Sequence, residues 1–117
     1  MIRRASSFER GDIVYVPLNP TVGKELQGDM RPALVLTAKA FNALGTALIA
    51  PITQGGDVAR YAGFAVTLMA SGTKTQGVVL VSAIRVVDLV ERGATVIEKA
   101  PDYVVQDALM RLAAMTE

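Results

Sequence analysis

The 117-residue sequence contains no cysteine and no histidine. Without cysteine the chain has no disulfides, no thiolate nucleophile and no cysteine-based zinc site. Without histidine it lacks the commonest metal ligand and the usual acid–base group near neutral pH. A magnesium site made only of carboxylates stays open, but no tight acidic cluster marks one. We therefore expect no metal and no cofactor, and any chemistry must use hydroxyls, amides, carboxylates and guanidinium groups.

Net charge is also small, because 12 basic residues against 11 acidic ones give a formal charge of +1. A general duplex-binding protein usually has a stronger basic excess. The first twelve residues include arginines but no apolar core, which is not typical of a signal peptide. No uncharged apolar run reaches the roughly 18–20 residues of a membrane span. We expect a cytoplasmic protein that does not bind membranes.

The composition favours one folded domain over residues 1–117, because 51% of the residues are hydrophobic and 20% are charged. We expect residues 1–8 to be flexible. Residues 94–100 fit either a short strand or the start of a helix. Many short strands without βαβ alternation favour an antiparallel sheet or a small barrel. Runs rich in β-branched residues predict these strands at 12–18, 33–38, 46–52, 63–69 and 78–89, the last kinked near Ser82–Ala83.

One helix is clear at the C-terminus, and it begins at Pro101. Apolar residues recur along it at the i, i+4 spacing of a core-facing stripe. Tyr103, Met110 and Met115 fall outside this stripe, and so small a fold has little interior in which to bury them. We therefore expect a homodimer. The stripe consists of Val104, Val105, Ala108, Leu109, Leu112 and Ala113.

Three motifs follow one another along most of the chain: RGDIVYVPLNPTVGKELQGDMRPALVL, APITQGGDVARYAGF and GVVLVSAIRVVDL. In their order and spacing they resemble the MazF/PemK (Kid) toxins of bacterial toxin–antitoxin systems, and the ChpB-type toxins most closely. The resemblance runs from about Phe8 to the C-terminal helix. It implies a MazF/PemK/CcdB-like fold, an SH3-like antiparallel β-barrel of about six to seven short strands with a C-terminal helix.

The resemblance also implies a function. Family members are homodimeric, metal-independent endoribonucleases that cleave single-stranded RNA, chiefly mRNA, at short sequence motifs, and thereby inhibit translation and growth. They use the 2′-hydroxyl of the substrate as the nucleophile and leave a 2′,3′-cyclic phosphate and a 5′-hydroxyl. A cognate antitoxin inhibits them, and we expect operator DNA to be contacted only through that antitoxin.

An RNA that supplies its own nucleophile needs neither cysteine nor histidine from the protein, which must orient the strand and stabilise transition-state charge. Arg31 matches the family's catalytic arginine, and its permanently charged fork can hold two phosphate oxygens. Thr53 matches the catalytic threonine, whose hydroxyl can donate to a non-bridging oxygen. Glu25 matches a family glutamate and is the most credible general base. An arginine before a proline, or a threonine at a strand end, is usually only structural, so the whole set of motifs carries these assignments.

Six further residues are candidates for RNA binding. Lys24 replaces a histidine found in several relatives, and Arg60 and Ala62 match a substrate-contacting stretch of the PemK branch. Two of the candidates have an equally good structural explanation: Lys24 as a solvated loop lysine and Arg85 as a polar residue on a strand face. The six candidates are Lys24, Gln54, Arg60, Ala62, Ser82 and Arg85.

The sequence departs from the PemK branch at Leu80 and Ser82. That branch has an arginine and an aspartate there, which are assigned as general acid and general base. Leucine has no proton to give, and serine is no base at neutral pH. The MazF branch also has leucine at the first position, so cleavage is compatible with this sequence. The general base stays open between Glu25, water and no residue at all.

Two other functions stay open at this point. CcdB-type gyrase poisons share the barrel without a nuclease site, because fold alone does not set function; the ending LMRLAAMTE does not resemble theirs. A homologue that binds RNA or antitoxin without cutting is the third possibility, raised by Leu80 and Ser82. The RNA motif that is cleaved depends on side chains in loops 19–30 and 54–62, and the sequence does not reveal it.

Overall fold

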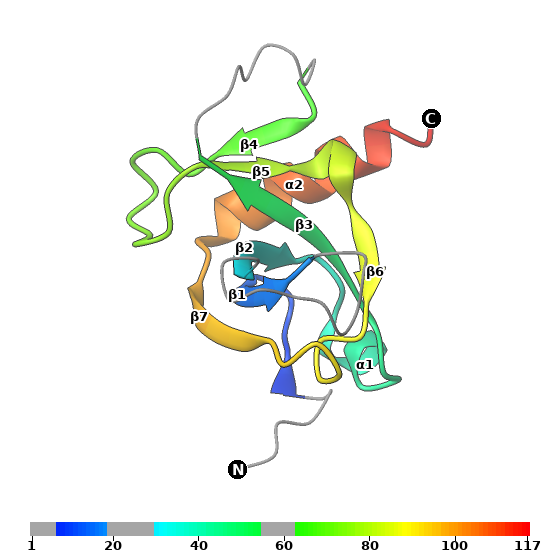
Figure 1. Ribbon diagram of the computed structural model, residues 1–117. Helices are drawn as coiled ribbons and strands as arrows, with labels where there is room; N and C mark the ends of the chain where they lie inside the picture. The colour runs from blue at the N-terminus through cyan, green and yellow to red at the C-terminus, as the bar shows by residue number, and fades with distance from the viewer. Residues whose placement is uncertain (1–6, 19–29, 55–62) are drawn as a thin grey trace.

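The computed structural model describes residues 7–18, 30–54 and 63–117. These residues form seven strands, and every recorded strand pair is antiparallel. The strand order is β4-β5-β3-β2-β1-β7, with β6 paired to β3, which confirms the predicted antiparallel β fold with a C-terminal helix (Figure 1). The elements are β1 (Asp12–Pro17), β2 (Met30–Val35), α1 (Lys39–Asn42), β3 (Ala47–Thr53), β4 (Ala65–Thr67), β5 (Val78–Leu80), the 3₁₀-helix η4 (Val81–Ala83), β6 (Arg85–Val87), β7 (Thr95–Lys99) and α2 (Asp102–Ala114).

Strand β2 begins earlier than the sequence predicts. Its first residue is Met30, because pairing with β1 continues through Tyr15–Pro32 and Val16–Arg31 to Pro17–Met30. The predicted strand 78–89 is divided into β5 and β6 by η4, so the expected kink near Ser82–Ala83 is confirmed. Residues 95–99 form a strand, which resolves the alternative left open there.

Strand β3 belongs to two parts of the sheet. Its first half, Ala47 to Ile49, pairs with β6, whereas Ile52 and Thr53 pair with β5. Figure 1 shows β3 running through the centre of the molecule, with β4 and β5 at one end and β6 beside the other. The change of partner lies between Ile49 and Ile52, so the C-terminal end of β3 belongs to the part that contains β4 and β5.

Alternate residues of the strands point to opposite faces of the sheet and pack into two separate hydrophobic cores. The helix α2 covers the first core through Val104, Val105 and Ala108, with Leu109 and Leu112 packed against it. The predicted stripe is confirmed except at Ala113, which is exposed near the end of the helix. Leu34 of β2 points into this core, whereas its neighbours Ala33 and Val35 belong to the second core. Each buried large aliphatic side chain stabilises the fold by roughly 1.5–3 kcal/mol. The second core consists of Phe8, Val14, Val16, Ala33, Val35, Ala47, Ile49, Val87, Leu89 and Ala94.

The apolar residues outside the helix stripe are exposed, as the sequence predicts. Tyr103 is 59% exposed and Met110 is 71% exposed, and Met115 is also on the surface. At the N-terminus, residues 1–6 lie outside the described residues, and Phe8 is buried in the second core and therefore belongs to the folded domain. Within the described ranges, no helix combines the length and apolar character needed to cross a bilayer.

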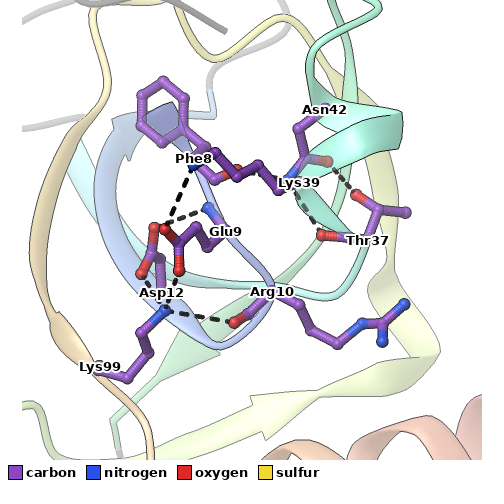
Figure 2. Close-up of polar contacts among 8 residues, drawn as sticks. All are labelled: Phe8, Glu9, Arg10, Asp12, Thr37, Lys39, Asn42 and Lys99. Carbon is purple, nitrogen blue, oxygen red and sulfur yellow. Dashed lines mark hydrogen bonds and ion pairs between the residues drawn. The ribbon is translucent and has the colours of Figure 1, made fainter. Parts of the chain in front are cut away.

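A polar cluster fastens the N-terminal end of β1 (Figure 2). The buried Asp12 carboxylate pairs with Lys99 Nζ at 2.9 Å and accepts a hydrogen bond from the Glu9 backbone N–H at 2.9 Å. Partial burial lowers the pKa of Lys99, but its hydrogen bonds and attraction to Asp12 and Glu9 outweigh that effect, so its pKa is raised. The buried Asn42 donates to the Phe8 carbonyl at 2.9 Å. These contacts explain the charged residues here as structural.

Candidate functional site

The strand register brings Arg31 and Thr53 to one face of adjacent strands. Strands β2 and β3 pair at Ala33–Pro51 and Val35–Ile49, and carrying this register two residues further aligns Arg31 with Thr53. Alternate residues of a strand share a face, so both side chains lie on the face of the second core, at its edge. The two residues for which the sequence predicts catalytic roles thus lie on the same face of the sheet, on neighbouring strands.

Arg31 differs from the other arginines in the described part of the chain. It is exposed, and no hydrogen bond or ion pair within that part engages its guanidinium group. The others donate to carbonyl or carboxylate oxygens: Arg10 to Leu36, Arg85 to Leu18, Arg92 to Pro17, and Arg111 to Asp107 and Gly63. A cation at a strand end that has no partner among the described residues is available to an anionic ligand.

Thr53 is held in place by the residue that precedes β5. Thr53 pairs with Val78, and Gly77 packs directly against the Thr53 backbone. A Cβ at Gly77 would lie 2.3 Å from the Thr53 carbonyl oxygen and 2.9 Å from its carbonyl carbon. Gly77 also has φ of +124°, a conformation that side chains disfavour. Only glycine therefore allows this approach. Sequence reasoning missed Gly77, because its role depends on this contact across the fold.

Paired residues on β5 and β4 extend this face of the sheet beyond Thr53. Val78 pairs with Thr67 on β4, so both residues share the Thr53 face. Both line a pocket of about 480 Å³, together with Met69 and Gln76. Pockets of several hundred Å³ are large enough for a small-molecule ligand or one ligand moiety. The candidate site therefore has a cation and a hydroxyl at its centre and an open pocket to one side.

Arg85 lies on the same face, because it pairs with Ile49, which is a residue of the second core. Its guanidinium donates to the Leu18 carbonyl, just after β1. Arg92 donates to the adjacent Pro17 carbonyl at 3.1 Å. These two arginines hold the end of β1, from which the segment 19–29 leads to Met30. The predicted RNA contact of Arg85 stays a prediction, and the structure gives its guanidinium a partner within the protein. Arg92 was missed by sequence reasoning.

Of the remaining candidate site residues, the structure describes only Gln54 and Ser82. Gln54 is exposed immediately after Thr53, and Ser82 is exposed on η4. Leu80 lies two residues beyond Val78, so it also faces the Thr53 side of the sheet and is half-buried. The predicted roles of Glu25, Lys24, Arg60 and Ala62 lie outside the described residues. In the described part, no group of three or more acidic side chains is arranged to hold a metal ion.

Comparisons with known proteins agree with this architecture. Residues 9–116 match the family model described as PemK-like, MazF-like toxin of type II toxin–antitoxin system. The chain is 54% identical over 114 residues to the endoribonuclease toxin ChpB of Escherichia coli (strain K12), covering 97% of this chain and 98% of that one. It is 41% identical over 116 residues to the endoribonuclease PemK of Escherichia coli, covering 98% and 86%.

A solved structure shows the same fold. A chain in the crystal structure of MazE–MazF (Form-II) from Deinococcus radiodurans aligns with a TM-score of 0.74 and 28% identity, covering 93% of this chain and 94% of that one. The family match spans nearly the whole chain, and the two relatives exceed 40% identity over almost their full lengths. This chain therefore belongs to the PemK-like, MazF-like family of toxins of type II toxin–antitoxin systems.

Proposed function

We propose that this chain is a metal-independent, sequence-specific endoribonuclease toxin that cleaves single-stranded RNA, mRNA above all, and thereby inhibits translation and growth. Membership of the toxin family supports the proposal, as do the endoribonuclease names of two relatives at 54% and 41% identity. The observation that carries it is the placement of Arg31, with no partner in the described part of the chain, on the same sheet face as Thr53.

The proposed reaction is a transesterification within the substrate. The 2′-oxygen of the RNA attacks the adjacent phosphorus, a bond from O2′ to phosphorus forms, and the bond from phosphorus to O5′ breaks. The products are a 2′,3′-cyclic phosphate and a 5′-hydroxyl. One proton leaves the 2′-hydroxyl and one is delivered to O5′. The protein must therefore hold the phosphate in line and stabilise the added negative charge.

Arg31 and Thr53 are suited to that task. The Arg31 guanidinium can donate two parallel hydrogen bonds to the non-bridging oxygens, and such charge-assisted pairs are about twice as strong as neutral ones. Thr53 is half-buried on the adjacent strand. Its hydroxyl donates only a long bond of 3.5 Å to the Gln54 carbonyl and can donate to a phosphate oxygen instead. Loss of one such preorganised donor typically costs about 3 kcal/mol. Leu80, which lies on the same face of the sheet, has no proton to transfer. Glu25 is the proposed base for the 2′-hydroxyl.

Several further residues surround this centre in our proposal and contact the RNA strand. Gln54 follows Thr53 directly and is exposed, and Ser82 is exposed on η4. Lys24, Arg60 and Ala62 complete the proposed contacts. The pocket of about 480 Å³ beside Val78 offers room for a nucleotide next to the scissile bond. Arg85 is half-buried and donates a hydrogen bond to the Leu18 carbonyl, so we propose that it contacts RNA only at the edge of the site.

We propose a cognate antitoxin as the protein partner, because the chain shares its fold with a chain of a MazE–MazF crystal structure. Contact with operator DNA would then occur only through that antitoxin. A homodimer is supported by the exposed apolar side chains of Tyr103 and Met110 on α2. A cytoplasmic location belongs to the same proposal, because messenger RNA is translated there. The gyrase-poison and non-cleaving alternatives are disfavoured, since both curated relatives are named endoribonucleases.

The test is cleavage of a mixed single-stranded RNA pool in EDTA by the wild type and by Arg31→Ala. We expect cyclic phosphate ends from the wild type and a loss of at least about 10²–10³-fold in kcat from the variant. The matched control is Arg10→Ala, which removes an exposed arginine that donates to the Leu36 carbonyl near the opposite end of β1. Equal cleavage by folded Arg31→Ala and Arg10→Ala proteins would overturn the proposal.

A further inference from the structure

The side chain of Glu98 on β7 makes an unusually complete set of hydrogen bonds for a half-buried carboxylate. Its Oε1 accepts from the Lys74 backbone N–H at 3.0 Å. Its Oε2 accepts from both the Thr75 backbone N–H and the Thr75 hydroxyl, each at 2.7 Å. All three donors belong to the loop between β4 and β5 (Figure 1). Glu98 therefore fastens this loop to a strand that is distant in sequence.

The fastened loop ends at the residue that supports Thr53. Only Gln76 separates Thr75 from Gly77, and Gly77 packs against the Thr53 carbonyl. The loop is also bonded internally: the Thr73 hydroxyl donates to the Thr75 carbonyl at 2.7 Å, and the Leu68 N–H donates to the Gly77 carbonyl at 2.9 Å. A displacement at Thr75 is therefore transmitted along a short, bonded path to Gly77.

Glu98 is suited to this task as a carboxylate. Both of its oxygens receive N–H or O–H donors, and the ionised form accepts these three bonds more strongly than the neutral acid does. Partial burial opposes ionisation, but the Thr75 hydroxyl bond, the two backbone bonds and the charge of Lys74 outweigh it and lower the pKa of Glu98. The acceptor is therefore ionised at neutral pH, and charge-assisted hydrogen bonds of this kind are stronger than neutral ones.

We propose that Glu98 is a positioning residue for the cleavage reaction: by holding Thr75, it keeps Gly77 against the Thr53 carbonyl and so keeps the Thr53 hydroxyl beside Arg31. This inference rests on the function proposed above. It assigns a role to a side chain that does not touch the substrate. A misplaced reacting group can cost up to about a hundredfold in rate, so a partial loosening through Glu98 should cost about tenfold.

The experiment compares Glu98→Gln with Glu91→Gln in steady-state cleavage of a short RNA. Both variants remove one negative charge, but Glu91 is an exposed residue on the turn after β6. We expect kcat to fall about tenfold in Glu98→Gln with KM within twofold of wild type, and neither to change by more than twofold in Glu91→Gln. Thr75→Val, which removes one of the three bonds from the other side, should give a smaller fall in kcat.

A double-mutant cycle separates positioning from general stability, because residues that act through one group show non-additive effects. If Glu98 acts through Thr53, Glu98→Gln costs about tenfold in the Thr53 background and less than twofold in Thr53→Ala. An equal cost in both backgrounds would overturn the inference, as would an unchanged kcat in folded Glu98→Gln.

A second readout does not depend on cleavage. The Thr53 and Gly77 amide resonances should shift in Glu98→Gln and stay in place in Glu91→Gln. A wild type that fails to cleave RNA would overturn the proposed function, and these resonances would then decide the positioning inference by themselves. Unmoved Thr53 and Gly77 resonances in Glu98→Gln would refute it.

Discussion

Replacement of Gly77 by alanine tests how tightly the loop before β5 constrains Thr53. The added Cβ would lie 2.3 Å from the Thr53 carbonyl oxygen, which is backbone and cannot rotate away. Residue 77 also has φ of +124°. Backbone strain of this kind costs about 1–3 kcal/mol, and overpacking adds about 1–3 kcal/mol. We expect Gly77→Ala to lower the free energy of unfolding by about 2–6 kcal/mol.

Gly72→Ala is the matched control, because it changes the same residue type in the same loop. Gly72 has φ of +89°, yet a Cβ there would meet no atom within 4 Å. This variant therefore carries the backbone strain without the clash, and we expect a loss of about 1–3 kcal/mol. The difference between the two variants isolates the contact with Thr53.

The assay has two parts. Urea unfolding gives the two free energies, and RNA cleavage at a temperature where both variants stay folded gives kcat. Because the clash must move Thr53 or its neighbours, we expect kcat to fall at least tenfold in Gly77→Ala and to fall less in Gly72→Ala, which changes only the lining of the pocket. Equal stability losses and equal kcat values in the two variants would refute the reasoning.

Three further predictions concern the charged residues. Lys99→Ala leaves the buried carboxylate of Asp12 without its cation and should lower the free energy of unfolding in urea by about 1–2 kcal/mol. The control is Lys39→Ala, which removes an exposed ion pair with Glu9 at 3.9 Å and should cost less than about 0.5 kcal/mol. The pKa of Glu98 is lowered in the fold, so ionised Glu98 stabilises the folded state above its ordinary pKa of 4.5, and this stabilisation is lost as pH falls through the lowered pKa. Glu98→Gln should therefore reduce the dependence of the free energy of unfolding on pH in acid. An unchanged dependence would contradict this prediction. Arg85→Ala should lower the free energy of unfolding by about 1–2 kcal/mol, because it removes the donor to the Leu18 carbonyl. An unchanged free energy of unfolding would instead favour a role for Arg85 in contacting the substrate alone.

Local sequence patterns predicted most of the elements. Strands β1 and β3, the kink at η4 and the start of α2 after Pro101 follow from β-branched runs, apolar spacing and proline placement. The start of β2 did not follow, because proline within a strand reads as a boundary, while pairing with β1 carries the ladder through Pro32. Strand pairing depends on residues that are distant in sequence, so the residues around Pro32 alone do not predict it.

The candidate site was predictable only in part, for the same reason. Arg31 and Thr53 were identified through motifs, and the register then placed them on one face. Gly77 and Glu98 were missed because their roles depend on contacts across the fold: Gly77 on the Thr53 carbonyl, Glu98 on a loop 23 residues away. Nothing in the composition of SGTKTQG distinguishes such a loop from an ordinary turn.

The central claim is that Arg31 and Thr53 act on an RNA that attacks its own phosphate. The most direct measurement uses two short RNAs that differ only by one 2′-deoxyribose, placed 5′ of the scissile phosphate, incubated with the protein in EDTA. We predict that the all-ribose strand is cut to a 2′,3′-cyclic phosphate and that the substituted strand is left intact at that bond. Cleavage of both strands at the same rate would contradict the claim.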